Sequence, residues 1–248
     1  MHVGIITYQT GHLKTWHILR KLMTKSFDVT LYAFPFFPRP QEEKFFEDRP
    51  FQLIDFDIKK FCLENRIGYV EMDGWEEKDV VKFGKIGGPE TPDVYLTCIA
   101  KIIPDVFIKS RMIINAHPGL LPENRGVDAF KWAIVHRWPV GISLHVIDRH
   151  IDRGTLLHRM RIPVLPTDTF RDVTDRAYEM ECDLQANFDC YLKELKKNRV
   201  VSDQFPLSKK RISEELERKL EGLFLEHRRN FVRMSAEKDM IPQEIGVK

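Results

Sequence analysis

The sequence has few cysteines and none of the spacings that usually give them a structural role. Its four cysteines stand at positions 62, 98, 182 and 190, and no two form a Cys-x-x-Cys pair. Zinc ribbons and disulfide frameworks need closer, regular spacing. We therefore expect free thiols and a cytoplasmic protein.

Long apolar runs and an excess of one charge are also missing. No stretch approaches the roughly 20 apolar residues that cross a bilayer, and no charged leader with an apolar core opens the chain, so we expect no membrane insertion. Lysine and arginine total 39 against 37 for aspartate and glutamate. This balance argues against nucleic acid as the main partner, and we interpret the basic runs at 209–211 and 227–229 as solvated helix faces.

Glycine is scarce after the first predicted strand, residues 3–7, where Gly11 stands alone and no Gly-x-Gly-x-x-Gly pattern forms. Nicotinamide binding is therefore disfavoured. Apolar spacing predicts a helix over 13–23, a strand over 29–34, helices over 58–65 and 76–83, and strands near 69 and 94. This alternation predicts an α/β fold with a Rossmann-like, mostly parallel sheet flanked by helices.

The segment at 115–122 reads Asn-Ala-His-Pro-Gly-Leu-Leu-Pro and follows a short apolar strand. Side chains two apart on a strand emerge on the same face, so Asn115 and His117 should point together. Pro118 disfavours a helical conformation at His117 and holds it at a strand end, where open α/β sheets place ligands.

A second apolar strand, predicted over 139–148, leads to the run Asp-Arg-Gly at 152–154. Gly154 adopts a positive φ at little cost, and another apolar run follows it. We therefore predict a tight turn between two strands that fixes the carboxylate of Asp152.

These two motifs resemble those of the folate-dependent formyltransferases, whose Asn-x-His-Pro-x-Leu-Leu-Pro loop is followed by an Asp-x-Gly turn. The resemblance covers residues 90–165 well and the flanks in outline. It implies that Asn115, His117 and Asp152 are catalytic and that 10-formyltetrahydrofolate is the cosubstrate. Gly119 stands where the family usually has serine, which puts the rigidity of the loop in question.

The chemistry of formyl transfer suits these residue types. Attack of an amine on a formyl group develops negative charge on oxygen, and Asn115 is a neutral donor for it. His117 beside Asp152 would favour its charged form and donate as well, while Asp152 orients the imidazole and relays the proton of the amine. The alternative is that His117 caps a loop and Asp152 stabilises a turn.

The resemblance also implies where the folate lies. Ile99, Ile103 and Leu121 are candidate apolar walls, or alternatively plain core, and Asp148 and His150 are candidate contacts from the loop before Asp152. Imidazoles and carboxylates over 145–152 also suggest a metal, but His145 and His150 are an odd number of residues apart and would face opposite sides of a continuing strand. We predict no metal.

The acceptor should contact a proline-rich loop over residues 35–52. Its aromatic rings would stack on a base, and Arg39 and Arg49 would neutralise a diphosphate. The alternative is that the rings tuck the loop onto the body. Arg125 would reach a phosphate, and Trp132 either edges the sugar pocket or belongs to the core.

Thr167 or Asp168 should cap a long helix running to about residue 197. We divide the chain into a catalytic domain, 1–198, and a partly helical appendage, 199–248. The amphipathic helix of the appendage has three open roles: covering the body, completing the acceptor pocket, or pairing with a second subunit in a homodimer.

The chain is too short for the RNA-binding domain of the initiator-tRNA enzymes, and its length resembles that of nucleotide-amino-sugar N-formyltransferases of bacterial surface polysaccharide pathways. We therefore expect the acceptor to be an amino sugar linked to a nucleoside diphosphate. Three alternatives stay open: a formyltetrahydrofolate hydrolase, a glycinamide ribonucleotide formyltransferase, and a non-catalytic nucleotide-binding module.

Overall fold

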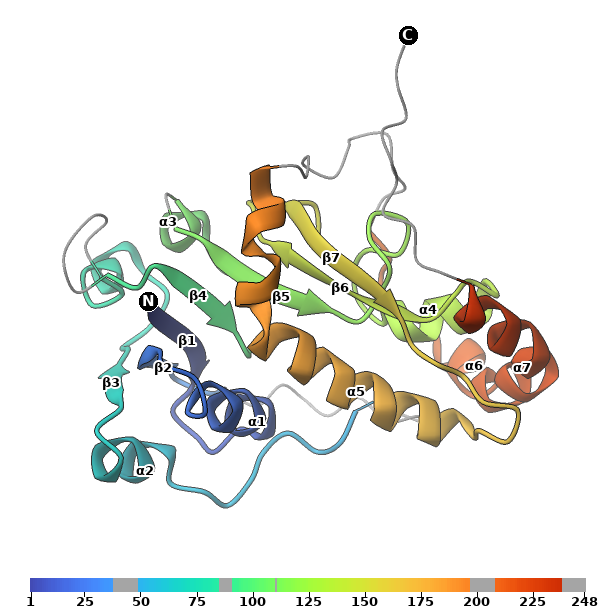
Figure 1. Ribbon diagram of the computed structural model, residues 1–248, viewed down its shortest axis with the longest axis horizontal. Helices are drawn as coiled ribbons and strands as arrows, with labels where there is room; N and C mark the ends of the chain where they lie inside the picture. The colour runs from blue at the N-terminus through green and yellow to red at the C-terminus, as the bar shows by residue number, and fades with distance from the viewer. Residues whose placement is uncertain (38–48, 85–90, 110, 197–207, 238–248) are drawn as a thin grey trace, which may run out of the picture.

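The computed structural model describes residues 1–37, 49–84, 91–109, 111–196 and 208–237 (Figure 1). Its strands are β1 (His2–Tyr8), β2 (Asp28–Phe34), β3 (Gly68–Glu71), β4 (Val94–Thr97), β5 (Ile113–His117), β6 (Gly141–Val146) and β7 (Thr155–Arg161). The helices are α1 (Leu13–Leu22), α2 (Ile58–Glu64), α3 (Asp105–Ile108), α4 (Ala129–Val135), α5 (Phe170–Ala186), α6 (Glu214–Glu217) and α7 (Leu220–Ala236), with 3-10 helices η1 (Glu77–Val81) and η2 (Phe188–Lys196).

The seven strands form one sheet in the order β3-β2-β1-β4-β5-β6-β7. The neighbours among the first five strands of this order, β3, β2, β1, β4 and β5, pair in parallel. The pairs β5–β6 and β6–β7 are antiparallel. This confirms the predicted α/β fold with a mostly parallel sheet. The chain runs outward from β1 to β3 and then returns to the other side of β1, so the strand order reverses between β1 and β4, where open α/β sheets commonly bind ligands at the carboxyl ends of the strands.

Two buried clusters cover the two faces of the sheet. Because side chains alternate along a strand, Ile5 and Ile114 pack into one cluster while their neighbours Ile6 and Ile113 pack into the other. The larger cluster includes residues of α1, α4, α5 and α7, and Figure 1 shows α1 and α5 side by side in front of the sheet. Burial on both faces explains the continuous apolar runs of the central strands.

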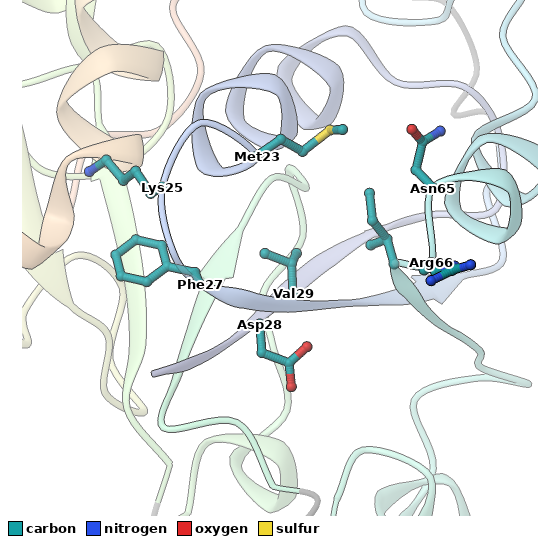
Figure 2. Close-up of a pocket in the computed structure, with 8 residues that line it drawn as sticks. Met23, Lys25, Phe27, Asp28, Val29, Asn65 and Arg66 are labelled. Atoms are coloured by element: carbon teal, nitrogen blue, oxygen red, sulfur yellow. The ribbon is translucent and has the colours of Figure 1, made fainter.

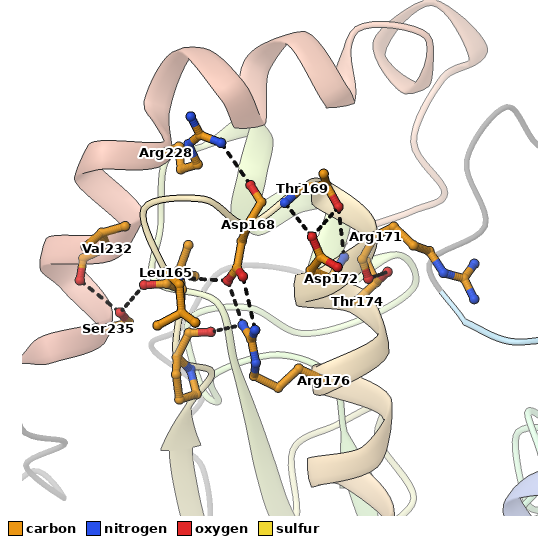
Figure 3. A network of polar contacts seen from close by, with 12 residues as sticks. Leu165, Asp168, Thr169, Arg171, Asp172, Thr174, Arg176, Arg228, Val232 and Ser235 are labelled. Atoms are coloured by element: carbon orange, nitrogen blue, oxygen red, sulfur yellow. Dashed lines mark hydrogen bonds and ion pairs between the residues drawn. The ribbon is translucent and has the colours of Figure 1, made fainter.

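The long helix α5 begins later than predicted. Its N-cap is Thr169, whose hydroxyl accepts from the backbone N–H of Asp172 while the Asp172 carboxylate accepts from the N–H of Thr169 (Figure 3). Asp168 instead pairs with Arg176 at 2.7 Å and accepts the N–H of Leu165. The predicted cap at Thr167 or Asp168 is therefore wrong, because Asp168 is held by the loop before the helix.

Helices α6 and α7 pack beside α4 at one end of the molecule (Figure 1). Phe224 of α7 lies edge-on to Phe170, and the buried Lys131 of α4 pairs with the buried Glu217 of α6. The predicted division at residue 198 stays a prediction. Within the described residues, no helix is long and apolar enough to cross a membrane.

The sequence predicts solvated helix faces for the basic runs at 209–211 and 227–229, but one residue of each run contacts the body of the protein. Lys209 lies outside the helices, in a bridge with Gly126, and its ammonium is over the rings of Trp132 and Trp138. Arg228 of α7 donates to the carbonyl of Asp168. Both cations hold the C-terminal part of the chain to the body.

Two buried histidines are held uncharged by the fold. Burial, with the nearby Lys14 and Arg49, lowers the pKa of His12 from 6.5 to about 4. Burial likewise lowers the pKa of His145 to about 4, and the nearby Asp152 offsets only part of this effect. Folding therefore excludes a proton from both rings at pH values where the unfolded chain would bind one.

The Lys131–Glu217 pair should show strong coupling in a double-mutant cycle. We expect Glu217→Leu to lower the free energy of unfolding by about 3 kcal/mol, because the Lys131 ammonium stays buried without its carboxylate. Adding Lys131→Met should recover most of this loss. Urea unfolding of the four proteins measures the coupling, and additive losses would contradict it.

The free energy of unfolding should fall as the pH decreases from 6.5 towards 4. In this window the unfolded histidines bind protons that His12 and His145 exclude in the folded state, at a cost of about 2 to 3 kcal/mol per ring. His145→Gln should make this dependence shallower. An unchanged slope in His145→Gln would show that the ring is not the excluded group.

Candidate active site

Strand β5 brings Asn115 and His117 to the carboxyl end of the sheet, as predicted from their spacing. Asn115 lies opposite His145 of β6, and His117 lies opposite Ser143. Because paired residues project to the same face, all four side chains start from one face of the β5–β6 pair. His117 is nearly inaccessible, with 4% of its surface exposed.

Asp152 lies in the loop between β6 and β7 and is itself the strained residue of the turn. Its φ is +48°, in the left-handed region, whereas the prediction assigned that conformation to Gly154. Gly154 is needed for a different reason: a Cβ there would lie 1.8 Å from the carbonyl oxygen of Val146. The turn thus approaches β6 closely and delivers the carboxylate to the end of β5.

His117 has a protein partner at each ring nitrogen. Its Nδ1 is 3.5 Å from Oδ2 of Asp152, and its Nε2 is 2.9 Å from the carbonyl oxygen of Asn124. Oδ2 of Asp152 also accepts the N–H of Gly126 at 2.9 Å. His117 and Asp152, which come from the two separate sequence motifs, are therefore in contact.

The electrostatics favour an ionised Asp152. Burial alone would raise the pKa of this carboxyl, but His117, His145 and the N–H of Gly126 outweigh that effect and hold its pKa below 3.8. An ionised carboxylate accepts a hydrogen bond from a neighbouring imidazole N–H. This arrangement suits Asp152 to orienting His117 and receiving a proton through it.

His145 is the member of the cluster that sequence reasoning considered only as a metal ligand. Its Nε2 lies 3.4 Å from Nδ2 of Asn115 and 3.8 Å from Oδ1 of Asp152, so it stands between these two side chains. The register of an antiparallel β5–β6 pair would have identified it, since it lies directly opposite Asn115. Among the described residues, His145 Nδ1 and Asn124 Oδ1 are buried without a hydrogen-bond partner, as functional sites often allow.

The loop after His117 is pinned from two sides. The hydroxyl of Ser143 accepts the N–H of Leu121 and donates to the carbonyl of Gly119, each at 2.8 Å. Farther on, Lys209 pairs with the backbone on both sides of Gly126, donating its N–H to Arg125 and accepting that of Val127. The loop is therefore closed by β6 and by the C-terminal segment.

The residues predicted to contact folate fall into two groups. Leu121, Ile99 and Ile103 are buried, with exposed fractions of 0%, 9% and 5%. Asp148 and His150 are partly exposed in the loop before Asp152, where Asp148 accepts the N–H of His150. Their predicted role stays a prediction.

The residues predicted to contact the acceptor are dispersed. Arg39 lies outside the described residues, and Arg49 pairs with the buried Glu181 at 3.0 Å. Arg125 donates to the carbonyl of Ile151, next to Asp152. Trp132 donates to the carbonyl of Lys210 and so lies against the C-terminal segment. Of these, Arg125 is linked directly to the loop of Asp152.

Two other observations concern alternative sites. Within the described ranges, no three His, Cys, Asp or Glu side chains gather as a metal site. A cavity of about 230 Å³ lies at the amino end of β2, lined by residues that include Met23, Phe27 and Asn65 (Figure 2). Lys25 on its rim pairs with Asp189 at 2.7 Å. This cavity lies at the amino end of β2, whereas His117 lies at the carboxyl end of β5.

The chain is similar to known formyltransferases by sequence and by fold. Residues 81–186 match the formyl transferase family. Over 92 residues the chain is 34% identical to a GDP-perosamine N-formyltransferase of Brucella melitensis biotype 1, and this segment covers 36% of each protein. The matched segment thus spans about a third of that curated relative.

Two solved structures share the fold. One, described as a sugar N-formyltransferase from Shewanella sp FDAARGOS_354, has a TM-score of 0.52 and 20% identity, covering 91% of this chain and 87% of that one. The other, a phosphoribosylglycinamide formyltransferase from Campylobacter jejuni, has a TM-score of 0.55 and 18% identity, covering 77% and 97%.

The family match spans both β5, with Asn115 and His117, and the loop of Asp152, so the cluster described above lies within it. Residues 81–186 therefore match the formyl transferase family, and the fold of the chain is similar to that of solved formyltransferases.

Proposed function

We propose that this protein transfers a formyl group from 10-formyltetrahydrofolate to the amino group of a nucleotide-linked amino sugar. One observation carries the formyl-transfer part: the 3.5 Å contact between His117 and Asp152, with Asn115 on the same face, inside the segment that matches the formyl transferase family. The sugar acceptor is supported by the similarity to a GDP-perosamine N-formyltransferase.

The folate cosubstrate would supply a formyl carbonyl whose oxygen gains negative charge as the amine adds. Asn115, partly buried at the end of β5, would donate its amide N–H to that oxygen. His117 would donate from Nδ1, because its contact with Asp152 is longer than the bond of Nε2 to Asn124 and is the easier one to exchange. Asp152 would orient the imidazole and receive the proton lost by the amine.

For the pterin of the folate we propose the five residues that the sequence suggests as its contacts. Asp148 and His150 would offer hydrogen bonds from side chains that are 34% and 38% exposed. Ile99, Ile103 and Leu121 would form the apolar wall behind it from buried positions. Buried Nδ1 of His145 is one further polar atom that a bound group could satisfy.

A diphosphate on the acceptor would need cations near the cluster. Arg125 is the best placed of those predicted, because its guanidinium already bonds to Ile151, one residue before Asp152. Arg49 is half-buried beside Glu181 and Lys14, where two cations face one carboxylate. We propose that these arginines anchor the nucleotide.

Replacing the proposed catalytic groups should abolish turnover without unfolding the protein. We expect Asn115→Ala, His117→Asn and Asp152→Ala each to lower kcat/KM by at least about a hundredfold. Asp175→Ala, which removes a half-exposed carboxylate on α5, is the matched control and should keep full activity. The assay is formyl transfer by each purified variant, and near-parental activity in any two of the three would refute the mechanism.

The nucleotide should matter more than the sugar for binding. We expect a free amino sugar to be a far poorer acceptor than its nucleotide-linked form, because remote binding energy positions the amine. Arg125→Ala should raise KM more than it lowers kcat, since a diphosphate contact exists before and during the reaction.

The measurement compares kcat/KM for both sugar forms, glycinamide ribonucleotide and initiator tRNA with one formyl donor. Equal values for the two sugar forms, or a preference for another acceptor, would contradict the assignment. Formate release without any amine would indicate a hydrolase instead.

A further inference from the structure

Gly119 lies against the imidazole of His117 with no room for a side chain. A Cβ added there would meet the carbonyl oxygen of Asn124 at 2.5 Å, Nε2 of His117 at 2.8 Å and Cβ of Ala129 at 2.9 Å. Two of these atoms are the two ends of the 2.9 Å hydrogen bond between Nε2 and Asn124. A residue at 119 therefore competes directly with that bond.

The backbone around this bond is fixed, so the ring is the part that would move. The carbonyl of Gly119 is held by Ser143 of β6. The N–H of Asn124 donates to Leu120, and its side chain donates to the carbonyl of Ala129. Because the backbone is anchored at both Gly119 and Asn124, a Cβ at 119 would displace the imidazole of His117, which can rotate about its side-chain bonds.

The bond to Asn124 also decides which nitrogen of His117 exchanges protons. A carbonyl oxygen only accepts, so Nε2 must carry a hydrogen whether the ring is neutral or charged. Nδ1 is then the nitrogen that gains and loses a proton, and it faces Oδ2 of Asp152 at 3.5 Å. Without the Asn124 bond, Asp152 would favour a hydrogen on Nδ1 of the neutral ring and leave Nε2 as the exchanging atom.

We propose that Gly119 is a positioning residue: its missing side chain lets the Asn124 carbonyl hold His117 as the Nε2–H tautomer, with Nδ1 as the proton-exchanging atom beside Asp152. This inference rests on the proposed function of His117 for its catalytic consequence. Its structural part, the tautomer, stands independently of any reaction. Gly119 is thus a requirement of the His117 geometry in this chain, where a Cβ would lie 2.8 Å from Nε2 of the ring.

The test is long-range ¹H–¹⁵N NMR of the full-length protein labelled at histidine, which distinguishes the two tautomers. The signals of His117 are assigned by their loss in His117→Asn. We expect the neutral ring of the parent protein to be the Nε2–H tautomer. In Gly119→Ala the Nδ1–H tautomer should dominate, and kcat should fall at least about tenfold with KM within about threefold.

Gly222→Ala is the matched control, because a Cβ there has nothing within 4 Å and should change neither spectrum nor rate. If Gly119→Ala does not fold, Asn124→Ala is the second variant, because it removes the side-chain bond to Ala129 and so frees the Asn124 carbonyl without adding atoms. We expect a mixture of the two His117 tautomers in this variant. A neutral Nδ1–H ring in the parent, or an unchanged tautomer in both loop variants, would overturn the proposal. A correct tautomer shift in a protein with no formyl transfer would refute the proposed function alone.

Discussion

The antiparallel pairing of β5 with β6 is the constraint on which the candidate site depends. It places His145 opposite Asn115 and Ser143 opposite His117, so one strand supplies the reactive side chains and its neighbour supplies the groups that hold them. A shift of one residue in this register would turn both supporting side chains to the other face. The same pairing ends where the loop of Asp152 begins, which brings the carboxylate back to the end of β5.

Holding the cluster in place has an electrostatic cost that the surrounding fold offsets. A neutral, buried His145 and an ionised Asp152 stand within 3.8 Å of each other, and both have lowered pKa values. The left-handed backbone at Asp152 adds strain, which sites of this kind commonly contain. The hydrogen bonds of Ser143 and of Gly126 stabilise the loops that impose this geometry.

Much of the fold and the central contact were predictable from the sequence. The two-residue spacing of Asn115 and His117 on an apolar strand fixes their common face, and the alternation of strands and helices fixes the α/β class. The role of His145 was not predictable from local pattern, because it depends on which residue lies across from Asn115. The cap at Thr169 was missed for a similar reason, since the Arg176 side chain from the second turn of α5 engages Asp168.

The positions of the residues predicted to contact the acceptor could not be predicted from the sequence. Arg49 and Arg125 looked equally available as cations in the sequence. In the structure one is engaged by a buried carboxylate from α5 and the other by a backbone carbonyl beside Asp152. Trp132 likewise contacts the C-terminal segment, because α4 faces the helices that follow it rather than the end of β5.

The bridge between Gly126 and Lys209 has a consequence for how the protein is made. The loop that holds His117 is paired on its far side with a segment that follows β5, β6 and α5 in the chain and is therefore synthesised after them. Until that segment emerges, the backbone groups of Arg125 and Val127 lack the strand partner that fixes them. All seven strands precede that segment in the chain, whereas α7, which completes the larger buried cluster, follows it, so the loop and this part of the core are completed only at the end of synthesis.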